Sequence, residues 1–186
     1  MTLRYSPGQQ VLHWLTVGLM FAILPVAWVV GALKEDTPPF YFYLDIHKSI
    51  GLTIFALTLV RVGWRVKQHP PAYPAAWSAP TRLMAAATAL GLLFMMIAMP
   101  ITGYLWTTGH GFDVAPFDLI HFPRIAWKDR PLGDAAKAFH QFGQWAVYGL
   151  IGLHLAGVSY HLVVKRDGAL GRMLPEQDKS QGGAAI

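Results

Sequence analysis

Four apolar stretches, each long enough to cross a lipid bilayer, dominate this sequence. They run from about residues 11–33, 44–66, 83–106 and 135–164 of the 186-residue chain. A membrane-spanning helix needs roughly 20 predominantly apolar residues, and only structures that satisfy their own backbone hydrogen bonds are stable in hydrocarbon. The sequence therefore predicts an all-α fold, an integral membrane four-helix bundle over residues 1–175. We expect residues 176–186 to form a flexible cytoplasmic tail.

Composition supports a membrane protein and excludes several kinds of cofactor site. Hydrophobic residues make up 54% of the chain and charged residues 13%, against about 25% charged in soluble domains. Cysteine is absent, which excludes disulfides, thiolate-bound clusters and covalent haem attachment through C-x-x-C-H. Any haem must be held by non-sulfur ligands or by methionine.

The charged residues are divided unequally between the two ends of the predicted bundle. The end that carries both termini has nine basic and three acidic residues, and the opposite end has six basic and seven acidic residues. The positive-inside rule then places both termini in the cytoplasm. The net charge of +5 thus follows membrane topology, and we expect a multi-pass protein of the bacterial inner membrane, in contact with lipid and without a nucleic-acid partner.

The longest connection, residues 107–134, is unusually apolar for a loop. We expect it to lie on the outer membrane surface, on the evidence of five residues: Phe112, Phe117, Ile120, Phe122 and Trp127.

Histidines inside the spans are the clearest functional signal, because ionisable residues are costly in a membrane. His140 and His154 lie on the fourth span, 14 residues apart. Fourteen residues return to within ~40° of the same helix face and rise ~21 Å. His47 matches the outer level of His140, and His13 matches the inner level of His154. The sequence therefore predicts two bis-histidine sites, His13 with His154 and His47 with His140.

Paired imidazoles suit b-type haem, since the iron accepts one on each face and no open position remains. Zinc fits less well, because it prefers four clustered ligands. A single membrane histidine is often only a packed or hydrogen-bonded residue, but four at matched depths favour haem. We expect two haem b per chain, with iron bound by His13, His47, His140 and His154.

Two further residues are candidates near the inner level. Arg61 follows His47 by 14 residues, so it either pairs with a haem propionate as a guanidinium fork or extends to the headgroups. His161 follows His154 by seven residues and shares nearly the same face. It is a candidate to replace His154 as ligand, to contact a propionate or to line a quinone site.

Several motifs together resemble the prokaryotic di-haem cytochrome b561 family, which is related to hydrogenase cytochrome b subunits. They are Tyr5-Ser6 through His13-Trp14, H-K-S-I-G-L from His47, R-x-x-W-R from Arg61, P-I-T-G-Y-L from Pro100, G-L-H ending at His154, and R-D-G-A-L-G-R-M-L-P from Arg166. The resemblance implies four helices, two b haems on the same four histidines and electron exchange with ubiquinone. Some members resembling this chain oxidise periplasmic superoxide and pass the electron to quinone.

The leading functional hypothesis is therefore an oxidoreductase that joins a periplasmic donor, superoxide being the candidate, to the quinone pool. Lys48 and Lys137 flank the outer ligands and are candidates to attract an anion; Arg124, Lys128 and Arg130 are further candidates. We expect no obligate protein partner. The alternatives are a cytochrome b membrane-anchor subunit that passes electrons from a dehydrogenase or hydrogenase to quinone, and a transporter of haem or a small solute.

Overall fold

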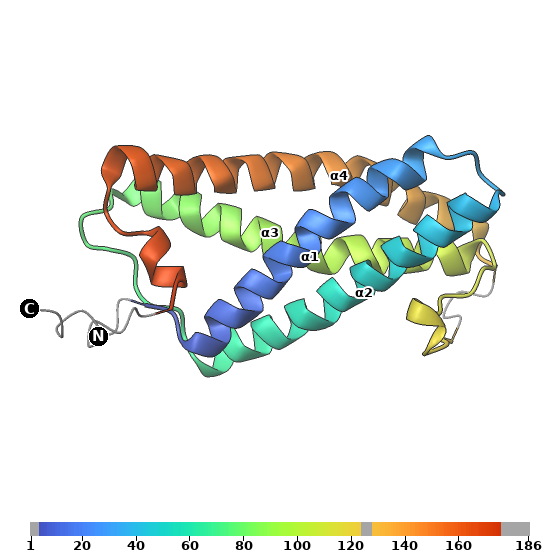
Figure 1. Cartoon of the computed structure of the whole chain (residues 1–186), viewed down its shortest axis with the longest axis horizontal. Helices are drawn as coiled ribbons and strands as arrows, with labels where there is room; N and C mark the ends of the chain where they lie inside the picture. The colour runs from blue at the N-terminus through green and yellow to red at the C-terminus, as the bar shows by residue number, and fades with distance from the viewer. Residues whose placement is uncertain (1–3, 124–127, 176–186) are drawn as a thin grey trace, which may run out of the picture.

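The computed structural model describes residues 4–123 and 128–175. Four long helices form the molecule (Figure 1). They are α1 (Pro7–Ala32), α2 (Pro38–Lys67), α3 (Ala79–Gly109) and α4 (Arg130–Ser159). Three short helices accompany them: η1 (Pro116–Asp118), the π-helical η2 (Tyr160–Lys165) and η3 (Leu170–Met173). The described residues contain one isolated β-bridge and no strand. The predicted all-α four-helix fold is confirmed; the expected tail at 176–186 lies outside the described residues.

Each long helix has a proline near its beginning, which a hydropathy profile alone does not detect as a helix start. A proline occupies the first or second helical position in all four: Pro7, Pro38, Pro80 and Pro131. Proline suits these positions because its fixed φ is helical and the missing N–H would have no partner there. The helices consequently begin four to six residues before the apolar stretches that mark them in the sequence.

The helices pack along the long axis of the molecule, with α1 crossing the bundle obliquely in Figure 1. α3 packs most extensively against α4, α1 packs against α2, and α2 also contacts α3. The first and last described segments meet, since the Tyr5 amide donates to the Arg172 carbonyl at 3.1 Å. We call this the terminal end of the bundle. The opposite end, where residues 110–129 connect α3 to α4, is the loop end.

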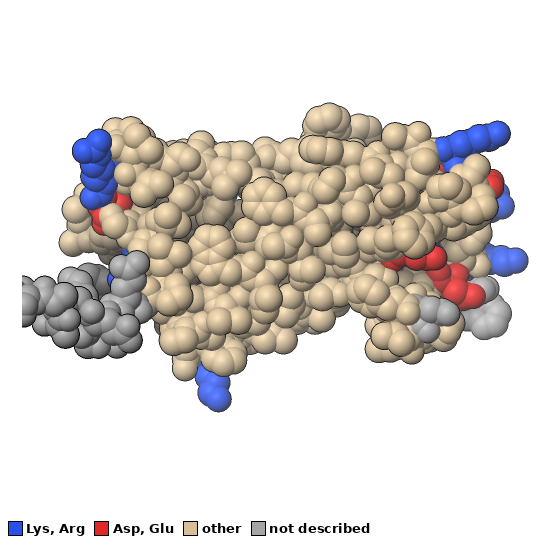
Figure 2. Space-filling model, in the orientation of Figure 1, with Lys and Arg blue, Asp and Glu red and all other residues tan. Residues whose placement is uncertain are grey.

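The lateral surface of the bundle is apolar and the charges lie at its ends. Large hydrophobic side chains such as Phe21, Phe94 and Phe142 are 66%, 60% and 77% exposed. Figure 2 shows Lys, Arg, Asp and Glu gathered toward the two ends of the visible face, with an uncharged band between them. All four long helices are long and apolar enough to cross a membrane, with mean hydropathy from 1.4 to 2.2. The protein is therefore a multi-pass membrane protein.

Small hydroxyl side chains occupy the most buried positions between the helices. Ser49, Thr58 and Thr108 are at most 1% exposed. The threonine hydroxyls donate to carbonyls one turn earlier in the same helix, at 2.7 Å for Thr58 and 3.0 Å for Thr108. Small side chains that satisfy their own polar group allow close helix approach within a membrane.

Candidate functional site

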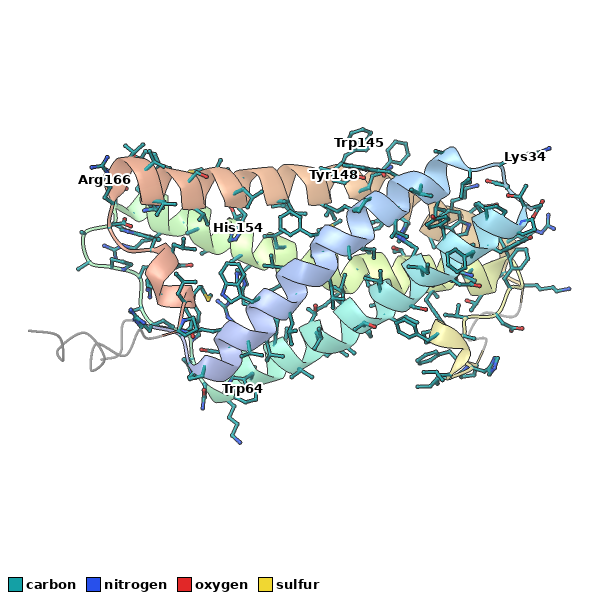
Figure 3. All side chains as sticks on the ribbon, in the orientation of Figure 1. Lys34, Trp64, Trp145, Tyr148, His154 and Arg166 are labelled. Carbon is teal, nitrogen blue, oxygen red and sulfur yellow. The ribbon has the colours of Figure 1, made fainter. Side chains whose placement is uncertain are left out.

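Two histidine pairs bridge separate helices inside the bundle. His13 of α1 and His154 of α4 have ring centroids 6.4 Å apart, with their planes inclined by 66°. His47 of α2 and His140 of α4 are 6.1 Å apart, inclined by 78°. His154 lies between α4 and the crossing helix α1 (Figure 3). The structure thus brings together the same pairs that helical spacing predicted, one toward each end of the bundle.

The separation within each pair fits a single metal ion between the rings. A metal–imidazole bond is about 2 Å long, and a ring centroid lies roughly 1 Å behind its nitrogen, so two axial imidazoles have centroids about 6 Å apart. In addition, the buried Nδ1 of His47 has no hydrogen-bond partner. No group of three or more His, Asp or Glu side chains that could hold a metal occurs among the described residues. Each pair of imidazoles would therefore hold one haem iron.

The orientation of His140 is fixed by helix α3. Its Nδ1 lies 2.9 Å from the Met99 carbonyl oxygen and 3.3 Å from the Thr102 hydroxyl. A carbonyl oxygen only accepts, so Nδ1 carries the proton and Nε2 is free to bind a metal. Such a hydrogen bond to the far ring nitrogen is typical of metal-binding histidines. Gly103 makes room for the ring, because a Cβ there would lie 3.1 Å from His140 Cε1.

Arg61 lies beside the pair at the terminal end. Its Nη2 is 3.5 Å from Nδ1 of His13, and the contact is partly buried. The guanidinium therefore stands next to the paired rings, where it can meet an acidic group of a bound cofactor.

Comparison with known proteins places the chain in a family. The family model of prokaryotic cytochrome b561 matches residues 4–176. The chain belongs to this family. Cytochrome b561 homolog 2 of Escherichia coli is 28% identical over 179 residues, which is 96% of this chain and 95% of the relative. Cytochrome b561 homolog 1 of the same organism is 25% identical over 183 residues, 94% of this chain and 98% of the relative. The resemblance seen in the motifs is confirmed: this is a haem-dependent membrane electron-transfer protein with b-type haem.

His161 belongs to a separate cluster at the terminal end. Its side chain is 11% exposed, and its Nδ1 lies 2.6 Å from Asp167 Oδ2. Its ring stacks on Trp77 at 4.2 Å, and the Trp77 indole N–H donates to the same carboxylate oxygen at 2.8 Å. Burial opposes ionisation of Asp167, but hydrogen bonds from His161, Trp77 and the Ala169 amide outweigh it, so the pKa of this carboxyl is lowered. His13 meets His154 rather than His161.

The lysines predicted beside the loop-end pair are both partly enclosed. The Lys48 side chain is 20% exposed, with its Nζ 3.8 Å from Asp45. Lys137 Nζ lies 5.3 Å from the ring centroid of Trp106, and that ring is 5.9 Å from His140. Lys137 is thus connected to the histidine pair through one aromatic ring.

The other basic residues predicted at the loop end have no contact with the His47–His140 pair among the described interactions. The Lys128 side chain packs near Gly111, and Arg130 begins α4. Arg124 lies outside the described residues. Among the loop histidines, His110 is 3.0 Å from Asp134 and bonds the Trp106 carbonyl at 2.9 Å, so it links the end of α3 to the start of α4.

Sequence reasoning missed the residues of α3 that serve the site. The Met99 carbonyl, the Thr102 hydroxyl and Gly103 surround His140. Thr102 and Gly103 belong to the P-I-T-G-Y-L motif from Pro100, but the motif does not indicate that they face His140. No sequence signal identifies which carbonyl of one helix faces a side chain of another.

Proposed function

We propose that this protein is a di-haem cytochrome that carries electrons from superoxide at the periplasmic face to the membrane quinone pool. The observation that carries the di-haem part of the proposal is the presence of two cross-helix imidazole pairs at different depths, joined by one helix; superoxide and quinone are the donor and acceptor that the family resemblance implies. His13 and His154 would hold one haem, and His47 and His140 the other. Haem iron supplies one-electron redox chemistry when bound. The residues of the chain would set its depth and orientation.

We expect two b-type haems per chain. Each pair supplies two imidazoles at about the separation that one iron requires, and the two pairs are ~21 Å apart along α4 by helix rise. A pyridine haemochrome assay on the purified protein, with protein quantified by amino-acid analysis, measures the ratio. A ratio of one haem per chain in fully loaded protein would contradict the proposal.

The direction of the reaction follows from the two ends of the bundle. Superoxide gives up one electron and becomes molecular oxygen, and two such electrons with two protons reduce a quinone to a quinol. Lys48 and Lys137 at the loop end would draw the anion toward the nearer pair. Arg61 and His161 lie at the terminal end, where Arg61 would bind a propionate and His161 a propionate or the quinone.

We expect superoxide from an enzymatic source to reduce the haems, and a soluble ubiquinone analogue to reoxidise them. The variants Lys48→Gln and Lys137→Gln should each slow haem reduction several-fold, and added salt should slow it in the wild type. Lys34→Gln is the matched control, because Lys34 is exposed at the tip of the same end (Figure 3). Failure of superoxide to reduce the haems, or of quinone to reoxidise them, would reject this donor and acceptor.

We expect both termini to be cytoplasmic, with the protein in the bacterial inner membrane. The terminal end has the excess of basic residues, and such residues are retained on the cytoplasmic side. A C-terminal fusion to green fluorescent protein should fluoresce, and one to alkaline phosphatase should be inactive. The opposite result would place the terminal end in the periplasm and reverse the electron path proposed above.

A further inference from the structure

The connection between α3 and α4 folds back along the side of α2. Helix η1 packs against α2, and the backbone amide of Phe117 donates to the Ser49 hydroxyl at 2.8 Å. Val114 is only 3% exposed, and the Phe122 amide donates to its carbonyl at 3.0 Å, which closes the segment into a short hairpin-like turn. The segment from Val114 to Phe122, here the outer hairpin, is therefore anchored to the bundle.

The anchoring point lies below the membrane surface rather than above it. Asp45 and Arg65 lie near the two ends of the predicted span in α2 and are 20 residues apart, which is ~30 Å of helix and about the thickness of the hydrocarbon core. Two charged residues, Lys48 and Arg61, lie between them, and the Lys48 ammonium reaches back to Asp45 at 3.8 Å. Ser49 is four residues, about 6 Å, further into this region than Asp45. Figure 1 agrees, since η1 lies beside the bundle and short of the helix ends.

The outer hairpin turns large apolar side chains away from α2. Phe117, Leu119 and Ile120 are 62%, 79% and 59% exposed. Phe117 also has a left-handed backbone, with φ of 53°, a conformation that is unusual for a bulky residue. The hydrogen bond to Ser49 holds it there. The exposed side chains therefore continue the apolar lateral surface of the bundle.

We propose that the outer hairpin is inserted into the lipid at the periplasmic interface and seals the flank of the bundle beside the His47–His140 pair. Ser49 makes this insertion possible, because an amide N–H without a partner is not tolerated in hydrocarbon and the buried hydroxyl supplies that partner. Lipid is the occupant favoured by depth: a soluble partner protein could not reach side chains at the level of Ser49 without entering the bilayer. The proposal concerns the placement of the loop and does not depend on superoxide or quinone as substrates.

The test uses the absence of cysteine from the chain, which allows single-site labelling. Leu119→Cys and Ile120→Cys would carry a nitroxide in haem-loaded protein, reconstituted in phosphatidylethanolamine–phosphatidylglycerol vesicles. Glu35→Cys is the control, because Glu35 is exposed in the α1–α2 connection at the same end. Power saturation would compare collisions with oxygen, which concentrates in lipid, and with a water-soluble nickel chelate.

Labels at 119 and 120 should collide more often with oxygen than with nickel, and the label at 35 should do the reverse. A nickel accessibility at 119 and 120 equal to that at 35 would overturn the insertion and leave the surface free for a periplasmic partner. Ser49→Ala, combined with the label at 119, should raise nickel accessibility several-fold while the haem content stays unchanged. An unchanged value would overturn the role of Ser49.

Discussion

Replacing His47 with alanine is expected to remove the haem at the loop end and to halve the haem content of the protein. The ring of His47 comes from α2 and that of His140 from α4, so one substitution would leave only one histidine to hold the haem. Alanine keeps the helix intact because it has the best helix propensity. Reduced-minus-oxidised spectra and pyridine haemochrome content measure the result. His140→Ala should give the same loss, and the terminal-end haem should remain.

Two further variants separate loss of a ligand from general damage. His13→Ala should produce the reciprocal result, losing the terminal-end haem and retaining the other. His110→Ala is the matched control, because His110 lies at the loop end but contacts Asp134 and the Trp106 carbonyl. It should retain both haems. Loss of both haems from His47→Ala protein that still inserts would show that the two sites are not independent.

The fold was predictable from the sequence because a membrane leaves few alternatives. Four apolar stretches of sufficient length define four helices, since hydrocarbon excludes unsatisfied backbone. The exact starts were not predictable from hydropathy, because helices such as those starting at Pro38 and near Pro131 begin several residues before the apolar stretches that mark them. Proline at the first or second helical position marks those starts, and hydropathy averaged over a window does not detect it.

The pairing of the histidines was predictable for a different reason. Two residues 14 positions apart on an α-helix lie on nearly the same face and differ in height by a fixed rise. His140 and His154 therefore lie on one face of α4 at two depths in the membrane. Depth then selects one partner for each. The depth of a residue in the membrane does not determine the register of α3 against α4. The environment of His140 depends on that register.

His161 shows where helical periodicity fails. Seven residues after His154, it would share the face of that residue if α4 continued regularly, which left three roles open. The helix instead widens into a π-helical turn from Tyr160, and the ring of His161 stacks on Trp77 beside Asp167. Its neighbours come from the α2–α3 connection and from the segment after η2, and no periodic pattern relates those positions.

Substituting Gly103 with valine is expected to abolish or severely weaken the loop-end haem without touching a ligand. A Cβ at position 103 would lie 3.1 Å from Cε1 and 3.3 Å from Nδ1 of His140. Rotating the ring away would cost free energy, because it would break the hydrogen bond between Nδ1 and the Met99 carbonyl. Valine adds two methyl groups to that contact, and such overpacking costs about 1–3 kcal/mol. The imidazole should therefore leave its ligating orientation.

Gly91→Val supplies the matched control on the same helix. A Cβ at Gly91 would lie 3.0 Å from Cδ2 of Leu150, so the steric conflict in the α3–α4 interface is similar in size. Leu150 is a flexible aliphatic side chain that can change rotamer, and it is not an imidazole. Gly91→Val should lower thermal stability but keep both haems, whereas Gly103→Val should lose the loop-end signal and keep the terminal-end one. Equal haem loss in the two variants would mean that α3–α4 packing in general, and not the orientation of His140, controls haem binding.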